Sequence, residues 1–226
     1  MEQLILELAK PEPPAFANFV TGSNREAVAT LRRVAEGGIP ETGVVIWGPP
    51  GVGKTHLLQA AASAATAVGR IARYVASPAL VDASAPPSIL LCVDAIDTAD
   101  DAAQGRLFTL YNSLAETRGQ LLASANVAPA RLALRDDLRT RLGHGLVFEI
   151  AALLDADKAQ ALDAYAREHG FRLSKDVIDY LLAHGRRDMA TLVATLTALD
   201  RHSLAAKRPI TVPLLREWMQ RRPAEN

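Results

Sequence analysis

The sequence predicts an α/β fold, a parallel sheet with helices on both faces, followed by a small all-helical lid domain. Short apolar runs alternate with helical patterns up to residue 150, which is typical of a parallel sheet. A glycine-rich phosphate-loop pattern lies between the first apolar run and the next helix. After residue 151 only helical periodicity remains, so a second, helical unit is expected there.

Five strands and three helices are predicted in the first part of the chain. The run at 44–47 is short, apolar and rich in β-branched residues, as in a strand buried on both faces. Further strands are predicted at 71–76, 89–93, 121–124 and 146–150, and helices at 23–36, 55–68 and 106–114. Ser23 or Asn24 is placed to cap the first of these helices.

Four helices are predicted in the second part, at 154–169, 174–184, 188–204 and 211–220, with Asp155, Ser174 and Thr211 as cap candidates. This part carries 12 basic and 10 acidic residues, so it is not a basic DNA-binding module. We therefore predict an N-terminal peptide and linker at 1–15, an α/β domain at 16–152 and a helical lid at 153–226.

Composition narrows the classes of function. The 226 residues include 25 Lys and Arg and 25 Asp and Glu, for a net charge of zero, which argues against nucleic-acid binding through bulk charge. A single cysteine, Cys92, excludes an internal disulfide and fits a reducing compartment. No apolar run approaches the length of about 18 residues that spans a bilayer, and the N-terminus lacks a signal-peptide pattern. We expect a cytoplasmic protein without a membrane partner.

Residues 48–55, GPPGVGKT, match the phosphate-loop pattern GxxxxGK[ST]. The glycines let backbone N–H groups turn toward phosphates, and the following helix N-terminus adds positive potential. In this pattern Lys54 reaches the β- and γ-phosphates and the Thr55 hydroxyl binds Mg²⁺. The predicted nucleotide-binding residues here are Gly48, Pro50, Gly51, Val52, Gly53, Lys54, Thr55 and His56.

Asp94 follows the apolar strand at 89–93 and is the predicted acidic partner of Mg²⁺. ATPases of this type usually carry an acid at the next position to orient water, but this chain has Ala95. Asp97 lies two residues further on, and we expect it to point elsewhere. The sequence therefore favours nucleotide binding over hydrolysis. Cys92, on the same strand, is interpreted as a small buried apolar residue.

Several separated motifs resemble one family. Residues 16–25 (FANFVTGSNR), the phosphate loop, the Asp94 strand and residues 138–146 (LRTRLGHGL) together are similar to the AAA+ module of the bacterial replication initiator DnaA, and more closely to its shorter relatives, the Hda proteins. The resemblance covers nearly the whole chain. It implies that Phe19 and Asn24 lie near the adenine base and that Asn126 is the polar sensor after the fourth strand.

The same resemblance implies that Arg141 is an arginine finger that reaches into the nucleotide site of a neighbouring subunit. Without it, Arg141 would be interpreted as a solvated surface arginine. The lid departs from the family pattern, because Ala190 stands where a sensor arginine is expected, and Arg186 and Arg187 lie a turn earlier. Whether either replaces the missing arginine is left open, as is whether ADP or ATP is the resident nucleotide. We expect little hydrolysis by the chain itself.

The N-terminal segment has two interpretations. An apolar patch at 3–8 precedes a proline-rich stretch at 10–14, which fits either a frayed terminus or a peptide anchor on a stiff tether. The resemblance favours the sliding-clamp-binding peptide of Hda proteins, although Glu7 replaces a proline often found there. The predicted partner-binding residues are Gln3, Leu4, Leu6 and Leu8.

The resemblance implies a regulator of DnaA. Bound to the DNA-loaded sliding clamp of DNA polymerase III, it would promote hydrolysis of DnaA-bound ATP and so inhibit replication initiation, with DNA contacted only through the clamp. We find no room in this sequence for the flanking domains of the initiator or for its helices that grip single-stranded DNA. Opening of a replication origin is therefore not expected. Two alternatives are a self-standing AAA+ ATPase of the helicase-loader type and a non-catalytic adaptor between DnaA and the clamp. A homo-oligomer is left open, and the expected location is the replisome on the nucleoid.

Overall fold

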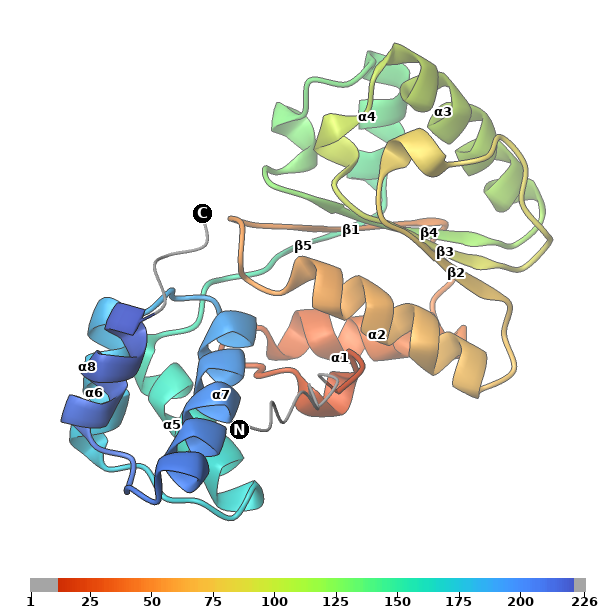
Figure 1. The fold of residues 1–226 in the computed structure, drawn as a ribbon. Helices are drawn as coiled ribbons and strands as arrows, with labels where there is room; N and C mark the ends of the chain where they lie inside the picture. The colour runs from red at the N-terminus through yellow and green to blue at the C-terminus, as the bar shows by residue number, and fades with distance from the viewer. Residues whose placement is uncertain (1–11, 222–226) are drawn as a thin grey trace, which may run out of the picture.

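Five parallel strands form the sheet of the computed structural model, which describes residues 12–221 (Figure 1). Their spatial order is β2-β3-β4-β1-β5, and each neighbouring pair is parallel. The strands are β1 (Gly43–Trp47), β2 (Ala72–Val75), β3 (Leu90–Val93), β4 (Gln120–Ala125) and β5 (Leu146–Glu149). All five lie where the apolar runs predict them. The predicted anchor residues Gln3, Leu4, Leu6 and Leu8 lie outside the described residues.

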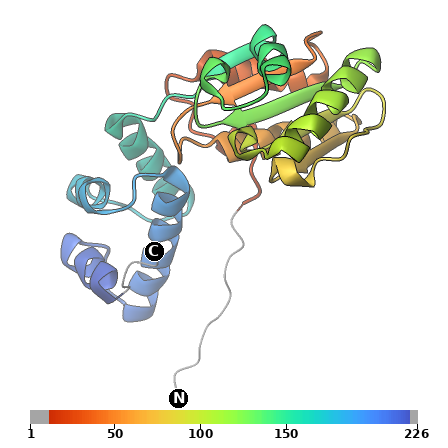
Figure 2. The same ribbon diagram turned by 90° about the horizontal axis from the view of Figure 1, so that it is seen from above.

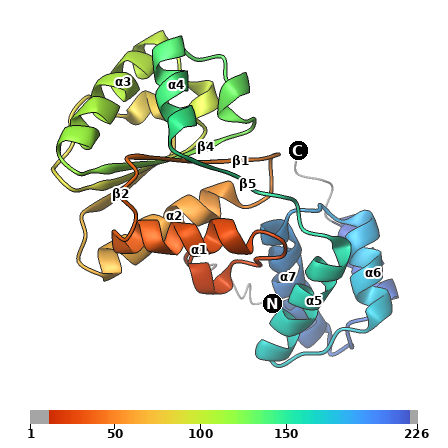
Figure 3. The ribbon, with the colours of Figure 1, turned by 180° about the vertical axis from the view of Figure 1, so that it is seen from behind.

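Helices cover both faces of this sheet, as predicted. Helices α1 (Arg25–Glu36) and α2 (Lys54–Ala67) lie on one face, and α3 (Asp101–Glu116) and α4 (Asp136–His144) lie on the other (Figures 1 and 3). Val44 and Ile46 pack into the core on the face covered by α1 and α2, and Val45 packs into the core on the face covered by α3 and α4. Alternate side chains of a strand point to opposite faces of the sheet. This is why β1 is apolar at every position.

Helix α3 is longer than predicted. It begins at Asp101, and its N-cap residue Asp100 accepts a hydrogen bond from the Ala103 N–H at 2.7 Å. Helix α4 is not among the predicted helices, because only two of its residues, Leu138 and Leu142, are buried. Short 3-10 turns connect the main elements at η1 (Phe16–Asn18), η2 (Pro78–Leu80), η3 (Ile96–Thr98) and η4 (Pro129–Arg131).

The lid is helical, as predicted, and has its own core. It consists of α5 (Asp155–Glu168), α6 (Lys175–His184), α7 (Met189–Ala206) and α8 (Val212–Arg221). Leu162, Leu181 and Leu196 are among its buried residues. Asp155 is the first residue of α5 and Leu154 its N-cap, so the predicted cap at Asp155 is wrong. The Ser174 side chain makes no capping bond, and the Thr211 Oγ1 accepts from the Leu214 N–H at 3.5 Å.

Asn24 joins the segment before α1 to the segment that leads from β5 into the lid. Figure 2 shows the lid helices on one side of the sheet domain. Asn24 occupies the N-cap position of α1, but its side chain makes no capping bond. Instead its Nδ2 donates to the Ala151 carbonyl at 3.0 Å, and its Oδ1 accepts from the Ala151 N–H at 2.8 Å. Nearby, a Cβ on Gly22 would lie 2.6 Å from Leu153 Cδ2. The segment before α1 is therefore packed on the segment between β5 and α5, where the domain boundary after residue 152 is predicted.

No helix among residues 12–221 is both long and apolar enough to cross a bilayer.

Replacing Asn24 with alanine should lower the free energy of unfolding by about 1–3 kcal/mol, because it leaves both backbone groups of Ala151 without their partner. Urea denaturation of the nucleotide-free protein measures this change. Ser23→Ala, at the exposed preceding position, is the matched control and should stay within about 0.5 kcal/mol of the wild type. Equal stability of the two variants would contradict the role assigned to Asn24.

Candidate functional site

The phosphate-loop pattern forms a tight turn between β1 and α2. Gly53 is the N-cap of α2 and has a φ of 96°, a backbone conformation that residues with a Cβ rarely adopt. A Cβ at this position would also lie 2.7 Å from Phe19 Cε2. The conformation of the loop therefore requires glycine at position 53, and the ring of Phe19, from the segment before α1, packs against it.

Lys54 extends across the inside of this loop. Its ammonium donates to the Gly48 carbonyl at 2.7 Å, to the Pro49 carbonyl at 3.0 Å and to Asn126 Oδ1 at 3.2 Å. Burial lowers the pKa of Lys54, while the charges of Asp97 and then of Asp94 raise it. The structure thus places the predicted phosphate-binding amine beside Asn126, the predicted sensor.

Asp94 accepts hydrogen bonds from several elements at the carboxyl end of the sheet. The Thr55 hydroxyl donates to its Oδ2 at 2.6 Å, and the Tyr74 hydroxyl donates to the same oxygen at 3.1 Å. The Ser124 hydroxyl donates to Oδ1. A hydroxyl and a carboxylate oxygen side by side are hard ligands of the kind Mg²⁺ prefers, so the residues present fit the predicted metal pair of Thr55 and Asp94.

Sequence reasoning missed Tyr74 and Ser124. Ser124 is the one polar side chain between Leu121 and Ala125, and a hydroxyl in an otherwise apolar strand signals a buried partner. Tyr74 carries no such signal, because an aromatic residue in a strand is ordinary. Burial raises the pKa of the Tyr74 hydroxyl, which keeps it a hydrogen-bond donor to Asp94.

The chain turns sharply after Asp94. Ala95 adopts a left-handed conformation, with φ 51°, and its N–H donates to Ser124 Oγ at 2.9 Å. This turn brings Asp97 back to the sheet edge, where Asn126 Nδ2 donates to Asp97 Oδ2 at 2.7 Å. The expectation that Asp97 points elsewhere is wrong. A carboxylate does lie beside the sensor, although it does not come from position 95.

Cys92 is fully buried on β3, as interpreted from the sequence. Burial also raises the pKa of its thiol, so the thiolate that reacts with electrophiles and metals is disfavoured.

The predicted adenine side of the site is built from the segment before α1. The rings of Phe19 and His56 are tilted against each other, with centroids 5.5 Å apart. His56 Nε2 lies 2.9 Å from the Ala15 carbonyl oxygen. The side-chain amide of Asn24 is hydrogen-bonded to the backbone of Ala151. The roles of Phe19, Asn24, His56, Pro50 and Val52 toward a nucleotide stay predictions.

The lid approaches the phosphate loop through Asp188. A Cβ on Gly51 would lie 3.4 Å from Asp188 Cβ, and the Asp188 carboxylate caps α7 by accepting from the Thr191 N–H at 2.9 Å. Arg186 Nε lies 3.5 Å from Asp188 Oδ2. Ala190, in the first turn of α7, is exposed. Asp188 is therefore a lid residue whose side chain lies next to the loop.

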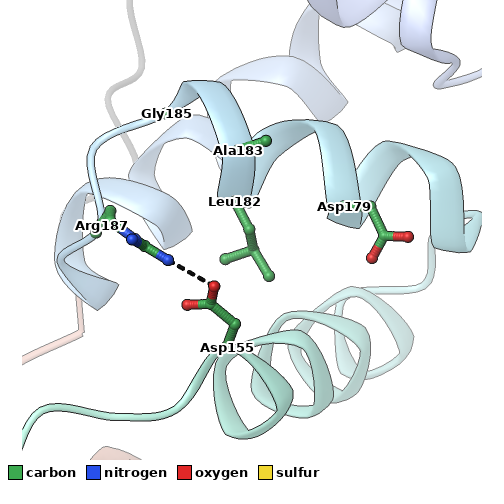
Figure 4. A pocket seen from close by; sticks show the side chains of 6 residues that line it. All are labelled: Asp155, Asp179, Leu182, Ala183, Gly185 and Arg187. Atoms are coloured by element: carbon green, nitrogen blue, oxygen red, sulfur yellow. Dashed lines mark hydrogen bonds and ion pairs between the residues drawn. The ribbon is translucent and has the colours of Figure 1, made fainter.

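Arg187 is held elsewhere in the lid. Its guanidinium donates to Asp155 Oδ2 at 2.5 Å, across a pocket of about 270 Å³ between α5 and α6 (Figure 4). Asp179 and Leu182 also line this pocket. Of the two arginines considered as replacements at Ala190, Arg186 is the one next to the residue that meets the phosphate loop.

Arg141 lies on α4 and rests on α3. Its Cζ is 4.3 Å from the centroid of the Phe108 ring, and its Nε donates to Asn112 Oδ1 at 2.9 Å. Its Nη1 is 3.4 Å from the Asp137 carbonyl oxygen. The side chain is half-buried, so the guanidinium is oriented by its own domain and still reaches the surface.

Two family models match separate parts of the chain. A model of the bacterial DnaA ATPase domain matches residues 12–82, which include the phosphate loop. A model of the Hda lid domain matches residues 155–219. The chain is a DnaA-related AAA+ protein with an Hda-type lid. The Hda-like assignment made from the motifs is thereby confirmed.

Solved structures agree on the fold of this Hda-like chain. Domain III of the Thermotoga maritima initiator DnaA matches with a TM-score of 0.75 at 18% identity, over 90% of this chain and 94% of that one. AMPPCP-bound DnaA from Aquifex aeolicus matches at 0.70 and 24%, over 86% and 67%. The Thermotoga maritima RuvB branch migration motor matches at 0.70 and 17%, over 92% and 72%.

Gly53→Ala should lower the free energy of unfolding by about 1–3 kcal/mol, because alanine is strained at this φ and its Cβ meets Phe19. Gly105→Ala is the matched control, since Gly105 lies inside α3 with no atom within 4 Å of an added Cβ. The control should raise stability by about 0.5–1 kcal/mol. Chemical denaturation of both variants measures the two changes, and a shift of the same sign in both would contradict this account of the loop.

Proposed function

We propose that this DnaA-related protein regulates replication initiation by promoting hydrolysis of ATP bound to DnaA. The observation that carries the proposal is the placement of Arg141, whose contacts come from α3 and α4 rather than from the phosphate loop of its own chain. A guanidinium held in this way is suited to a phosphoryl group on another subunit. The DnaA-type and Hda-type family matches support DnaA as that subunit.

The environment of Arg141 leaves one edge of its guanidinium for a partner. Phe108 supports the flat face through a cation–π contact, and Asn112 holds Nε. Among residues 12–221, no hydrogen-bond partner is found for Nη2. An arginine supplied from outside stabilises charge on the transferring phosphoryl group, an effect of about 10³–10⁵ in rate. Phe108 and Asn112 are thus positioning residues for Arg141.

The chain's own site would hold ADP or ATP mainly as a structural ligand. The loop glycines, Lys54 and Asn126 form the cradle, and Thr55 and Asp94 would hold Mg²⁺, which would screen the charge of the phosphates when bound. The AMPPCP complex of a DnaA relative supports a nucleotide at this place. Ala95 provides no carboxylate to orient an attacking water, so little turnover by this chain is expected.

The proposed partner on DNA is the sliding clamp, bound through Gln3, Leu4, Leu6 and Leu8. This part of the proposal rests on the amino-acid pattern of the N-terminal segment. A short apolar peptide on a proline-rich linker fits a groove on another protein, and the linker lets the AAA+ module reach DnaA nearby. Binding to the clamp would raise the local concentration of the module near replicated DNA.

A second candidate function is a self-standing ATPase, and one observation favours it. Asp97 brings a carboxylate to Asn126 at the edge of the site, where sequence reasoning expects none. Phosphate release by the purified protein without DnaA separates the two functions. Turnover near 1 s⁻¹, at the lower end of common enzyme rates, would support the ATPase.

Arg141→Ala should reduce the stimulation of DnaA ATP hydrolysis by about 10³-fold or more, since it removes the charge supplied to the phosphoryl group. The measurement is phosphate release from ATP-loaded DnaA in the presence of DNA-loaded clamp. Arg139→Ala, on the same helix and paired with Asp136 at the surface, is the control and should retain stimulation. Phe108→Ala should give a partial loss that Phe108→Tyr restores. Full stimulation by Arg141→Ala would remove the proposed arginine-finger mechanism.

Replacing Gln3 and Leu4 together with alanine should abolish binding to the clamp and leave nucleotide binding unchanged, because the two sites use separate residues. Size-exclusion chromatography with the clamp and titration with a fluorescent ADP analogue measure the two properties. Glu2→Ala, in the same segment but outside the predicted motif, is the control. Unaltered clamp binding by the double variant would rule out the proposed anchor.

A further inference from the structure

Donors of the chain itself occupy both oxygens of the Asp94 carboxylate. Its Oδ1 accepts from the Ser124 hydroxyl and from the Ala95 N–H, the latter at 3.1 Å. Its Oδ2 accepts from the Thr55 hydroxyl at 2.6 Å and from the Tyr74 hydroxyl at 3.1 Å. An ionised carboxylate has about four lone-pair sites, so these donors fill it. A divalent cation, or a water bound to it, therefore reaches Asp94 only if one donor leaves.

Ala95, Ser124 and Thr55 are donors that the fold or the predicted metal pair keeps in place. The Ala95 N–H belongs to the backbone of the left-handed turn after β3. Ser124 is fully buried on β4, which lies between β3 and β1. Thr55 is the other member of the predicted metal pair, so its hydroxyl is needed beside the ion. Loss of any of these donors would require a change in the backbone, in the core or in the pair itself.

Tyr74 is the donor that is free to move. It lies on β2, the edge strand of the sheet, and it is half-buried. Its bond to Asp94 is longer than that of Thr55, at 3.1 Å against 2.6 Å. A side-chain hydrogen bond with Gln59, on α2, gives the hydroxyl a second partner. The hydroxyl of Tyr74 thus keeps a partner when it releases Asp94 Oδ2.

We propose that Tyr74 gates the metal position of this site: its hydroxyl competes with Mg²⁺ for Asp94 Oδ2 and leaves that oxygen when metal and nucleotide bind together. Tyr74 therefore lowers the affinity for the metal and has no effect on nucleotide binding in the absence of metal. One hydrogen bond of ordinary net strength changes an equilibrium constant by about 2–10-fold, which sets the size of the effect. The inference rests on the nucleotide and metal binding proposed above and is independent of the role of Arg141.

Tyr74→Phe tests this competition, because it removes the hydroxyl and keeps the ring. Titration of the full-length protein with a fluorescent ADP analogue, in EDTA and then at increasing free Mg²⁺, gives the Mg²⁺ concentration at which half of the gain in affinity is reached. This concentration should fall by about 2–10-fold in the variant, and the affinity in EDTA should equal that of the wild type. Tyr180→Phe is the matched control, a lid tyrosine whose ring stacks on His184, and should behave as the wild type.

A spectroscopic measurement follows the Tyr74 hydroxyl directly. The chain has four tyrosines, so isotope labelling at the tyrosine Cζ gives one nuclear magnetic resonance signal for each, and the signal missing in Tyr74→Phe is that of Tyr74. This signal should shift when ADP is added with Mg²⁺ and should stay in place when ADP is added in EDTA. Should Tyr74→Phe fail to fold, phenylalanine variants of the other tyrosines assign the signal by elimination, and the shift is then measured on the wild type.

Each other outcome overturns the inference. A higher Mg²⁺ requirement in Tyr74→Phe would make Tyr74 a positioning residue that orients Asp94 for the metal, and an equal requirement would show that the hydroxyl does not compete. Nucleotide binding that ignores Mg²⁺ in both proteins would overturn the metal pair and the gate together. Absence of nucleotide binding to the wild type would overturn the proposed nucleotide site as well, and the stimulation assay with Arg141→Ala would still report on the regulator function.

Discussion

The buried carboxylate of Asp94 is the interaction around which the sheet edge is organised. A largely buried acid must have its oxygens satisfied, and hydroxyls from α2, β2 and β4 converge on it as Thr55, Tyr74 and Ser124. These bonds fix the start of α2 against β3, and with it the position of Lys54. The parallel sheet makes this possible, because the carboxyl ends of neighbouring strands meet at one edge.

Two features of the molecule bear on whether it binds a nucleotide or also hydrolyses it. Ala95 supplies no carboxylate, and its left-handed turn sends the next acid, Asp97, to the sensor. Arg141, which is proposed to meet a partner's phosphoryl group, is on α4, and α4 lies on the opposite face of the sheet from α2 (Figure 1). The molecule thus carries these two cations on different surfaces, and the proposed function assigns Lys54 to its own ligand and Arg141 to a partner's.

Sequence patterns account for the fold and for part of the site. The five strands, the lid helices and the phosphate loop follow from apolar periodicity and glycine spacing, which are local properties. Helix α4 escaped this reasoning because it buries only Leu138 and Leu142. The contacts of Tyr74 and Ser124 with Asp94, the hydrogen bonds of Asn24 to Ala151 and the return of Asp97 escaped it too, since each joins residues brought together by the packed fold. The placement of Asp97 depends on one backbone angle at Ala95 that residue type does not reveal.

The path of residues 12–24 has a mechanical consequence. Within this short stretch Ala15 contacts His56, Phe19 packs on Gly53, and Asn24 clasps the linker that carries the lid. A pull transmitted along the chain to residue 12 would reach the phosphate loop and the lid linker before it reached any strand. Tethering this protein by its first residues would therefore load the phosphate loop and the lid linker rather than the sheet.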